Sequence, residues 1–234
     1  MSREKNLSLA KQFGQLLHID LNSGLCSLSA FPETAAAFIG GRGFNVWYLY
    51  HHLPSGTDPL APENILMLSC GLLTGSSAPT SSRLHLNALS PLTGILGSSN
   101  IGGYAGAFLR SCNIASIIIT GKSQKPVSLY IDSNGACLED ASHLWGRDTF
   151  ETQEIIKQSH KDKKLKILTI GPGGEGKVSF GVIMTEKDHA AGRTGMGSVM
   201  GSKNLKAIVI CKGSHKHFHA ITPLQKKAVN AYVS

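Results

Sequence analysis

The sequence predicts an α+β domain with antiparallel or mixed sheets, on three observations. Candidate strands and helices follow one another without the regular β-α-β alternation of a doubly wound parallel sheet. Several neighbouring strands are separated by short turn-forming clusters, which join antiparallel strands. The chain has 234 residues, of which 26 are glycine and 16% are charged. This length suffices for a core without disulfides, and the low charge excludes a disordered chain.

The N-terminal half is predicted to open with a hairpin. Its expected elements are strands at residues 15–20, 25–29, 65–70 and 84–88, and helices at residues 32–38, 44–52 and 104–111. The turn-forming Asn22-Ser23-Gly24 joins the first two strands, Pro32 begins the first helix, and Gly40-Gly41 end it. Residues 65–70 form a short apolar run typical of a buried strand, whereas residues 84–88 alternate apolar and polar side chains.

The C-terminal half is predicted to hold more strands and one long helix. Its expected elements are strands at residues 116–120, 127–132, 136–139, 165–170, 178–184 and 205–211, and a helix at residues 148–160. Ser133-Asn134-Gly135 supplies the turn of a second hairpin. The helix has an acidic first turn and an apolar stripe at Phe150, Ile155 and Ile156.

The composition changes near the end of the chain. We expect one domain at residues 1–213, followed at residues 214–234 by a linker and the start of a helical domain. Residues 214–220 are polar and basic, as linkers are, and residues 225–233 have a helical pattern. No internal repeat is found at the periods typical of solenoid proteins.

Charge and cysteine usage exclude several classes of protein. The net charge is +8, but no aromatic residues alternate with the bases, so we expect no nucleic-acid partner. Much of the positive charge falls in segments expected to be solvated: Lys161, Lys163, Lys164, Lys166, Lys203, Lys206, Lys212, Lys216, Lys226 and Lys227. No signal peptide or apolar run of about 20 residues is present, so we expect no membrane partner. The five scattered cysteines are typical of reduced thiols in the cytoplasm.

Two glycine-rich loops are candidate phosphate sites. Residues 171–176 fit G-x-G-x-x-G, but residues 177–182 alternate like a strand, so the helix that a dinucleotide site needs is not expected. We predict a β–β connection there, with glycines at positive φ. Residues 192–198 place Arg193 between glycines, which suits either a phosphate or pterin site or a purely structural loop.

Arg83 stands alone in a long uncharged segment. Counting histidine as neutral, it is the only charged residue from Asn64 to Leu109, and many serines, threonines, asparagines and glycines surround it. An unpaired guanidinium is costly to bury, so Arg83 must meet solvent or an anion. The functional alternative is a platform of small residues that binds a large polar ligand, with Arg83 at its phosphate.

The positions of the histidines in the sequence give little indication of a catalytic site. His215, His217 and His219 alternate in the expected linker, and a solvated linker explains them better than a metal site. His51-His52 close a predicted helix and suit its negative end. His85 is expected to be a hydrogen-bonded core residue. No catalytic triad or paired-carboxylate pattern is found.

A series of short motifs, in order along the chain, resembles the N-terminal domain of the aldehyde ferredoxin oxidoreductases, the tungstopterin enzymes. They run from about Gly14 to Lys212. These motifs are Ile39-Gly40-Gly41-Arg42-Gly43, Pro62-Glu63-Asn64, Leu73-Thr74-Gly75, Ala78-Pro79-Thr80, Ser90-Pro91-Leu92-Thr93-Gly94, Asn100-Ile101-Gly102-Gly103-Tyr104, Ala141-Ser142-His143-Leu144-Trp145-Gly146, Ala190-Ala191-Gly192-Arg193 and Met200-Gly201-Ser202-Lys203-Asn204-Leu205-Lys206-Ala207-Ile208.

The resemblance implies both a fold and a cofactor. The fold is a four-layer α-β-β-α arrangement, in which two β-sheets are flanked by helices. This base carries a tungsten (or molybdenum) bis-molybdopterin, whose metal is held by the pterins' dithiolene sulfurs. A Mg²⁺ ion joins the two pterin phosphates, and no protein ligand to the tungsten comes from this domain.

The resemblance also implies roles for individual residues. Arg83 matches the family's pterin-contacting arginine, and Gly102 allows close approach of the backbone. Asn100 and Ala190 match the backbone carbonyls that bind Mg²⁺. The remaining cofactor-binding candidates are His189, Gly192 and Arg193. Two positions depart from the family pattern, because His189 stands where arginine is expected and Ile101 where serine is commoner.

The expected function is that of one part of an oxidoreductase. The family binds a [4Fe–4S] cluster through closely spaced cysteines in later domains, and no two cysteines here lie closer than Cys112 and Cys137. We therefore expect the cluster, a ferredoxin-like acceptor and a small aldehyde substrate to engage other domains or a partner subunit, and this chain alone to be inactive. The alternatives are a non-catalytic scaffold or cofactor-delivery subunit, and a phosphate- or nucleotide-binding module.

Overall fold

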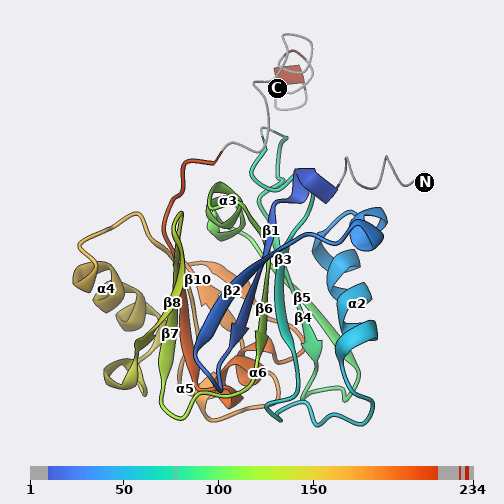
Figure 1. Ribbon diagram of the computed structural model, residues 1–234. Coiled ribbons are helices and arrows are strands. Elements are labelled where there is room, and N and C mark those ends of the chain that lie inside the picture. The colour runs from blue at the N-terminus through green and yellow to red at the C-terminus, as the bar shows by residue number, and fades with distance from the viewer. Residues whose placement is uncertain (1–9, 77, 216–226, 228–229, 232–234) are drawn as a thin grey trace.

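Two mixed β-sheets of six strands each form the centre of the molecule. The computed structural model describes residues 10–76, 78–215, 227 and 230–231 (Figure 1). The first sheet, in the order β2-β1-β6-β3-β4-β5, contains β1 (Gln15–Asp20), β2 (Leu25–Ala30), β3 (Leu66–Cys70), β4 (Leu84–Leu89), β5 (Leu96–Ile101) and β6 (Ile114–Thr120). The second, in the order β11-β10-β9-β12-β7-β8, contains β7 (Val127–Asp132), β8 (Gly135–Asp140), β9 (Lys166–Thr169), β10 (Ile183–Thr185), β11 (His189–Ala191) and β12 (Leu205–Ile210).

The two sheets have the same topology. Each begins with a hairpin whose first strand pairs in parallel with the last strand of its half, β1 with β6 and β7 with β12. Each last strand follows a short helix and an asparagine in the left-handed region, Asn113 (φ 63°) before β6 and Asn204 (φ 57°) before β12. As a result, β5 and β11 occupy equivalent outer positions in their sheets.

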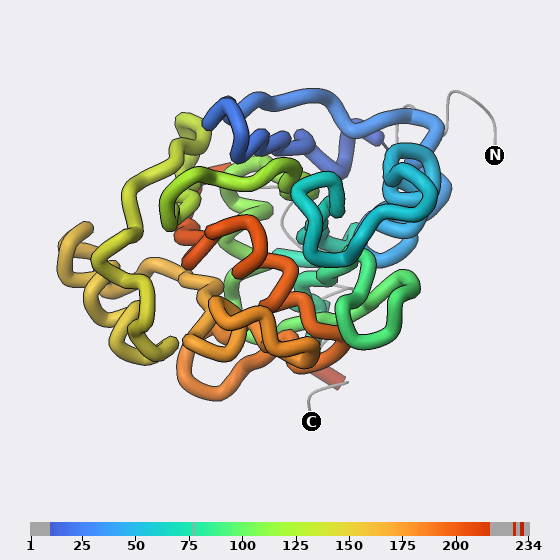
Figure 2. Tube along the Cα trace, turned by 90° about the horizontal axis from the view of Figure 1, so that it is seen from below, coloured from blue at the N-terminus to red at the C-terminus, as the bar shows by residue number. Residues whose placement is uncertain are grey.

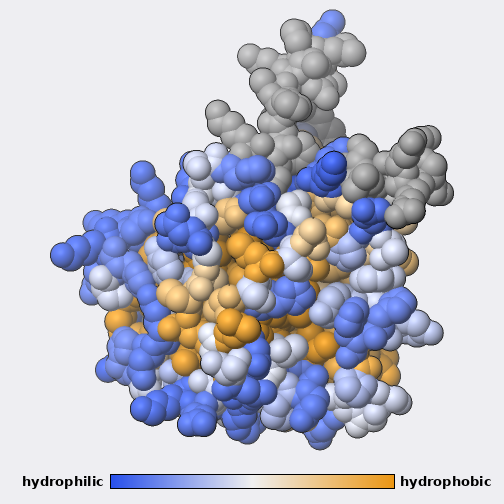
Figure 3. All heavy atoms as spheres, in the orientation of Figure 1, coloured by the Kyte–Doolittle hydropathy of each residue, from blue (hydrophilic) through white to orange (hydrophobic). Residues whose placement is uncertain are grey.

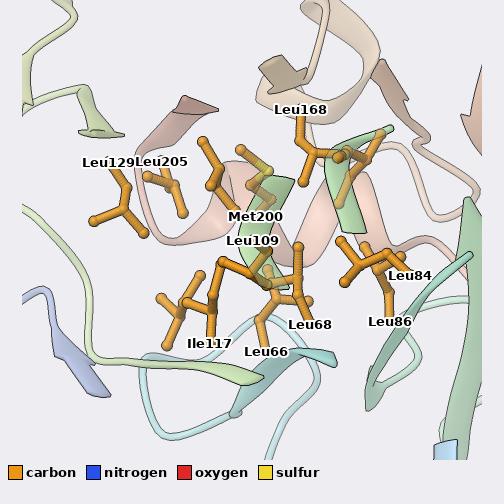
Figure 4. Close-up of a cluster of buried hydrophobic side chains, with 14 of the residues drawn as sticks. Leu66, Leu68, Leu84, Leu86, Leu109, Ile117, Leu129, Leu168, Met200 and Leu205 are labelled. Atoms are coloured by element: carbon orange, nitrogen blue, oxygen red, sulfur yellow. The ribbon is translucent and has the colours of Figure 1, made fainter. Parts of the chain in front are cut away.

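The main core lies between the sheets. It combines inward-facing leucines and isoleucines of both sheets with residues of α3 (Ala105–Ser111) and α6 (Met196–Ser202) (Figure 4). Every residue of α6 is buried, and the view from below places this segment in the middle of the molecule (Figure 2). The burial of so much apolar surface against both sheets is the main force that holds the halves together.

The outer faces of the sheets are covered by helices on opposite sides of the molecule (Figure 2). The 3₁₀ helix η1 (Glu33–Phe38) and α2 (Gly41–His52) pack Phe44 and neighbouring side chains on the first sheet. On the second sheet, α4 (Thr149–Ser159) packs Ile156 against β9 and β12. The predicted α+β fold with four layers is therefore confirmed.

Most of the predicted elements are present. Both hairpins form around the expected turns, and Asp148 caps α4 by accepting from the amides of Phe150 and Glu151. His51 and His52 place Nδ1 within hydrogen-bond distance of the carbonyls one turn earlier, at the end of α2. The expected linker beyond residue 215 and the helix at residues 225–233 lie largely outside the described residues.

Several local predictions are wrong. The strand expected at residues 178–184 is only β10, and β5 and β11 were not predicted at all. The short helix α5 (Pro172–Glu175) follows Gly171, where no helix was expected. None of the glycines of that loop has a positive φ, and Lys177 has one instead (57°). Glycine is needed at Gly174 because an added Cβ would lie 3.0 Å from the Gly197 carbonyl oxygen of α6.

Lys203 and Lys206 are buried, contrary to the prediction of a solvated segment. Lys206 Nζ lies 2.5 Å from Glu175 Oε1 and donates to the carbonyls of Arg147 and Ile170, both at 2.8 Å. Lys203 Nζ donates to two loop carbonyls at 3.0 and 3.1 Å. These lysines are structural because each ties loops to the strand β12 or its preceding turn.

Candidate functional site

A hollow of about 660 Å³ lies where β5 meets the loop after β11. It is lined by Arg42, Ser98, Ser99, Asn100, Ala190, Gly192 and Arg193. We refer to it as the arginine hollow. Two of its lining residues are exposed arginines, and none of the described residues that line it is acidic. Such a surface suits an anionic ligand.

Arg83 lies beside the hollow and is held by Asn100. It directly precedes β4, and its guanidinium Nη1 donates to Asn100 Oδ1 on the neighbouring strand at 2.5 Å. Arg83 is exposed, so its other N–H groups are accessible to a ligand. The one charged residue of the long uncharged segment thus meets one of the predicted site residues.

The loop after β11 is fastened to β5 by a direct hydrogen bond. The backbone N–H of Arg193 donates to Ser99 Oγ at 3.3 Å. Gly195, in the left-handed region at φ 69°, then begins the buried helix α6. Because α6 is fixed in the core, the loop that carries Gly192 and Arg193 is supported from both ends.

His189 lies over the glycines that follow β5. An added Cβ on Gly102 would come within 3.2 Å of His189 Nδ1, and one on Gly103 within 2.9 Å of His189 Cδ2. The opposite ring nitrogen, Nε2, lies 3.7 Å from Glu186 Oε2. Glu186 in turn pairs with Lys166. Glycine at these two positions therefore allows the imidazole to pack on the backbone.

Two buried polar atoms near the hollow lack a hydrogen-bond partner within the described part of the chain, Ser98 Oγ and His85 Nδ1. Ser98 lines the hollow, and His85 pairs in register with Asn100. Burial lowers the pKa of His85, and the positive charges of Arg42 and Arg83 lower it further. The prediction of a hydrogen-bonded core histidine is therefore wrong, because His85 is only partly buried and its Nδ1 has no partner among the described residues.

The structure brings the predicted site residues to one region. Four of them, Asn100, Ala190, Gly192 and Arg193, line the arginine hollow. The others adjoin it: Arg83 is bonded to Asn100, and Gly102 packs against His189.

Sequence reasoning did not identify two further residues of the region, Arg42 and His85. Arg42 lies between glycines at the first turn of α2, a pattern that is visible in the sequence as part of the motif Ile39-Gly40-Gly41-Arg42-Gly43. His85 carries no such signal, because its place beside Asn100 depends on strand pairing.

The glycine-rich loop at residues 171–176 does not belong to this region. Its helix α5 packs on α6, and Glu175 is bonded to Lys206 and to the backbone of Gly146. The loop that superficially matched a dinucleotide motif is therefore a packing element. No helix in the described part of the chain is both long and apolar enough to cross a bilayer.

Comparisons with known proteins agree with this arrangement. Residues 16–212 match the family model of the aldehyde ferredoxin oxidoreductase N-terminal domain. The chain is 41% identical over 199 residues to the tungsten-containing aldehyde ferredoxin oxidoreductase of Pyrococcus furiosus, covering 85% of this chain and 33% of that protein. It is also 36% identical over 217 residues to the aliphatic sulfonate oxidoreductase WOR-like subunit of the same organism, covering 86% of this chain and 34% of the relative.

A solved structure shares the fold. The active-site complex BamBC of benzoyl coenzyme A reductase, in complex with 1,5-dienoyl-CoA, superposes with a TM-score of 0.84 at 34% identity, covering 86% of this chain and 31% of that chain. The chain thus spans about a third of the length of the relatives that it matches. Because the family model covers most of the chain and these relatives exceed 30% identity, the chain belongs to the aldehyde ferredoxin oxidoreductase family, in which it corresponds to the N-terminal domain.

Proposed function

We propose that the arginine hollow and the residues beside it bind the phosphate groups of a tungsten (or molybdenum) bis-molybdopterin. One observation carries the proposal. Arg83 before β4, Asn100 on β5 and Arg193 in the loop after β11 come from three separate segments and converge where β5 meets that loop. Family membership supports the choice of cofactor, because the relatives include tungsten-containing enzymes.

The residues present fit such a group. The pterin phosphates need cations and hydrogen-bond donors, and the hollow offers Arg42, Arg193 and the unpartnered hydroxyl of Ser98. The cofactor holds two pterins, and the two sheets place the equivalent strands β5 and β11 together. Asn100 and Ala190 lie on these strands, so they are suited to offer one backbone carbonyl each to the Mg²⁺ between the phosphates.

His189 is proposed to contact the same anion in place of the family's arginine. Its ring packs on Gly102 and Gly103, which fixes its position at the end of β5. Gly192 and Arg193 complete the loop over the cofactor. These residues bind and orient the cofactor, and the bound group supplies the redox chemistry of its metal.

The proposed reaction of the complete enzyme is oxidation of a small aldehyde to its carboxylic acid. In this reaction water supplies the added oxygen and two protons are released, and a [4Fe–4S] cluster would carry the two electrons one at a time to ferredoxin. The cluster requires cysteines that this sequence does not place close together. We therefore assign the cluster and the aldehyde site to polypeptide beyond this domain, and we expect the 234-residue chain alone not to turn over.

The state of the cysteines bears on the cellular location of the protein. All five cysteines are free thiols, which favours a reducing, cytoplasmic location.

A subunit that holds the cofactor without catalysing a reaction is the second candidate function. Two relatives are named as a subunit and as an active-site complex, which supports a chain that works together with other polypeptide in either case.

Cofactor loading tests the proposal. The chain is purified from a host supplied with tungstate and molybdate, and metal and pterin are measured by mass spectrometry and fluorescence. We expect pterin and metal to copurify, and Arg83→Ala to lower their content about 10- to 100-fold, the effect of one charge-assisted hydrogen bond.

Arg147→Ala is the matched control, because Arg147 is an exposed arginine that pairs with Glu151 at 3.8 Å and does not line the arginine hollow. We expect it to load normally. If the wild-type chain carries neither metal nor pterin, even when co-expressed with the rest of the P. furiosus relative, the proposal is wrong.

A further inference from the structure

Apolar side chains project into solvent along η1 and α2. Phe38 is 46% exposed, Ile39 58%, Val46 38% and Tyr50 84%. We call this set, together with Trp47, the α2 face. On the other side of the same helix, Phe44 and Leu49 are buried against the first sheet. α2 is therefore apolar on both sides, whereas a helix that only covers a sheet has a polar outer side.

The α2 face is hollowed as well as apolar. A hollow of about 510 Å³, with almost entirely apolar walls, is lined by Phe38, Arg42, Gly43, Val46, Trp47, Tyr50 and His51. A second hollow of about 400 Å³ continues along the helix and shares Val46 and Tyr50 with the first. Arg42 lines both the first hollow and the arginine hollow. The apolar hollow of the α2 face and the candidate cofactor site thus adjoin at Arg42.

The helix α4 provides an internal comparison, because it covers the equivalent face of the second sheet. Its outer side carries ion pairs, Glu151 with Arg147 and Glu154 with Lys157. Phe150 is the exposed large apolar residue of that helix. The edge where β2 and β8 meet also has apolar surface (Figure 3), but the hollow that shares Arg42 with the arginine hollow lies on the α2 face. The α2 face is thus a feature of one half of a duplicated fold.

We propose that the α2 face is the docking surface for the polypeptide that corresponds to the other two thirds of the relatives. The chain spans 33% of the P. furiosus enzyme and 31% of the benzoyl coenzyme A reductase chain. The proposal rests on the proposed function, since a polypeptide that closes over the arginine hollow must reach Arg42 and hence the start of the α2 face. Its contacting surface is apolar, and Tyr50 and Trp47 supply aromatic anchors of the kind that dominate interfaces.

Hydrogen–deuterium exchange of the full chain tests the proposal. The probe is the part of the P. furiosus aldehyde ferredoxin oxidoreductase outside the matched region, added to the metal-free chain. We expect association that slows exchange in residues 41–53, and a dissociation constant about 10-fold or more higher for Val46→Asp with Tyr50→Ser. Both positions are exposed, so the fold is retained, which circular dichroism and thermal unfolding check.

Phe180→Ser is the matched control, because Phe180 is a 65% exposed aromatic residue outside the α2 face. It should associate like the unmodified chain. Three results overturn the proposal: no association at tens of micromolar, protection that spares residues 41–53, or concentration-dependent protection of α2 in the chain alone, which would assign the face to a second copy. Because no metal is present, these results are independent of cofactor loading, so failure of the proposed cofactor site is distinguished from failure of this interface.

Discussion

At the scale of single residues, the two buried lysines are held differently. Lys206 has a carboxylate partner, Glu175, and two carbonyl acceptors. Lys203 reaches two carbonyls, of Pro62 and Gly121, and Glu63 acts on it only at longer range. Burial lowers the pKa of Lys203 to about 8. We therefore expect the stability that Lys206 confers to depend on its carboxylate partner, and the stability that Lys203 confers to depend on pH.

Glu175→Gln is expected to destabilise the fold by about 3–5 kcal/mol, because it leaves the Lys206 ammonium buried without a counter-charge. The measurement is the free energy of unfolding in urea. Glu151→Gln removes a carboxylate from an exposed pair and should change it by less than about 0.5 kcal/mol. A loss below about 1 kcal/mol for Glu175→Gln would contradict the proposed role of the pair.

Lys203 should make stability depend on alkaline pH. Its pKa is about 8 in the folded chain against 10.5 ordinarily, so the unfolded chain binds more protons between these values. Its contribution to the free energy of unfolding therefore rises between about pH 8 and 10.5, by on the order of 3 kcal/mol. Lys203→Met should remove this rise from the pH profile of urea unfolding. If the two profiles have the same slope, the ammonium is not held as described.

These residues also show what a sequence does and does not reveal. Arg83 was identified because its isolation among small polar residues is visible in the chain itself. Lys203 and Lys206 were assigned to a solvated segment, because nothing local distinguishes a buried lysine from an exposed one. Their partners lie up to 141 residues away in the sequence, so only the assembled fold reveals them.

At the scale of elements, β5 was missed and the strand at residues 178–184 was predicted wrongly. β5 contains Gly97, Ser98 and Ser99, which are poor strand formers. An added Cβ on Gly97 would lie 2.7 Å from Met196 Cε of α6 and 3.0 Å from the Cβ atoms of Ser90 and Thr194, so glycine fits this position without displacing its neighbours. Residues 178–182 alternate like a strand, but an added Cβ on Gly181 would meet Ser198 of α6. In both places, packing against α6 overrides the local pattern.

The contact between the end of β5 and His189 can be tested through Gly103. Gly103→Ala introduces a side chain at φ 76°, 2.8 Å from Glu186 Oε2 and 2.9 Å from His189 Cδ2, and so displaces this histidine and the carboxylate beside it. We expect a loss of about 1–3 kcal/mol in the free energy of unfolding, together with lower metal and pterin content as His189 is displaced.

Gly24→Ala is the matched control, since Gly24 also has φ 76° but an added Cβ there meets nothing within 4 Å. This variant should lose only the free energy of unfolding that a side chain at positive φ costs, and it should load the cofactor normally. Equal effects of the two variants on loading would mean that His189 does not contribute to the site.

At the scale of the whole molecule, the two sheets share one core and should unfold together. Leu168 of β9 and Leu68 of β3 belong to the same buried cluster (Figure 4). Leu168→Ala is expected to cost about 2–5 kcal/mol, and hydrogen exchange should then accelerate equally in β3 and β9. Faster exchange confined to the second sheet would show that each duplicated half is an independent folding unit.

The fold class and family were accessible from the sequence, whereas the duplicated topology was not. The short motifs from residue 39 to residue 208 carry the family's pattern in order, and the match over residues 16–212 confirms it. The duplication depends on strand order and on the pairing of β1 with β6 and of β7 with β12. These are long-range pairings that leave little trace in one sequence.

The position of the metal tests the central claim most directly. Crystals of the chain loaded with tungsten, with data collected at the tungsten absorption edge, would locate the metal by anomalous scattering. The account predicts a single strong peak over the arginine hollow, with pterin density in contact with Arg83 and Arg193. A peak on any other face of the molecule, or an ordered cofactor that touches neither Asn100 nor Ala190, would contradict it.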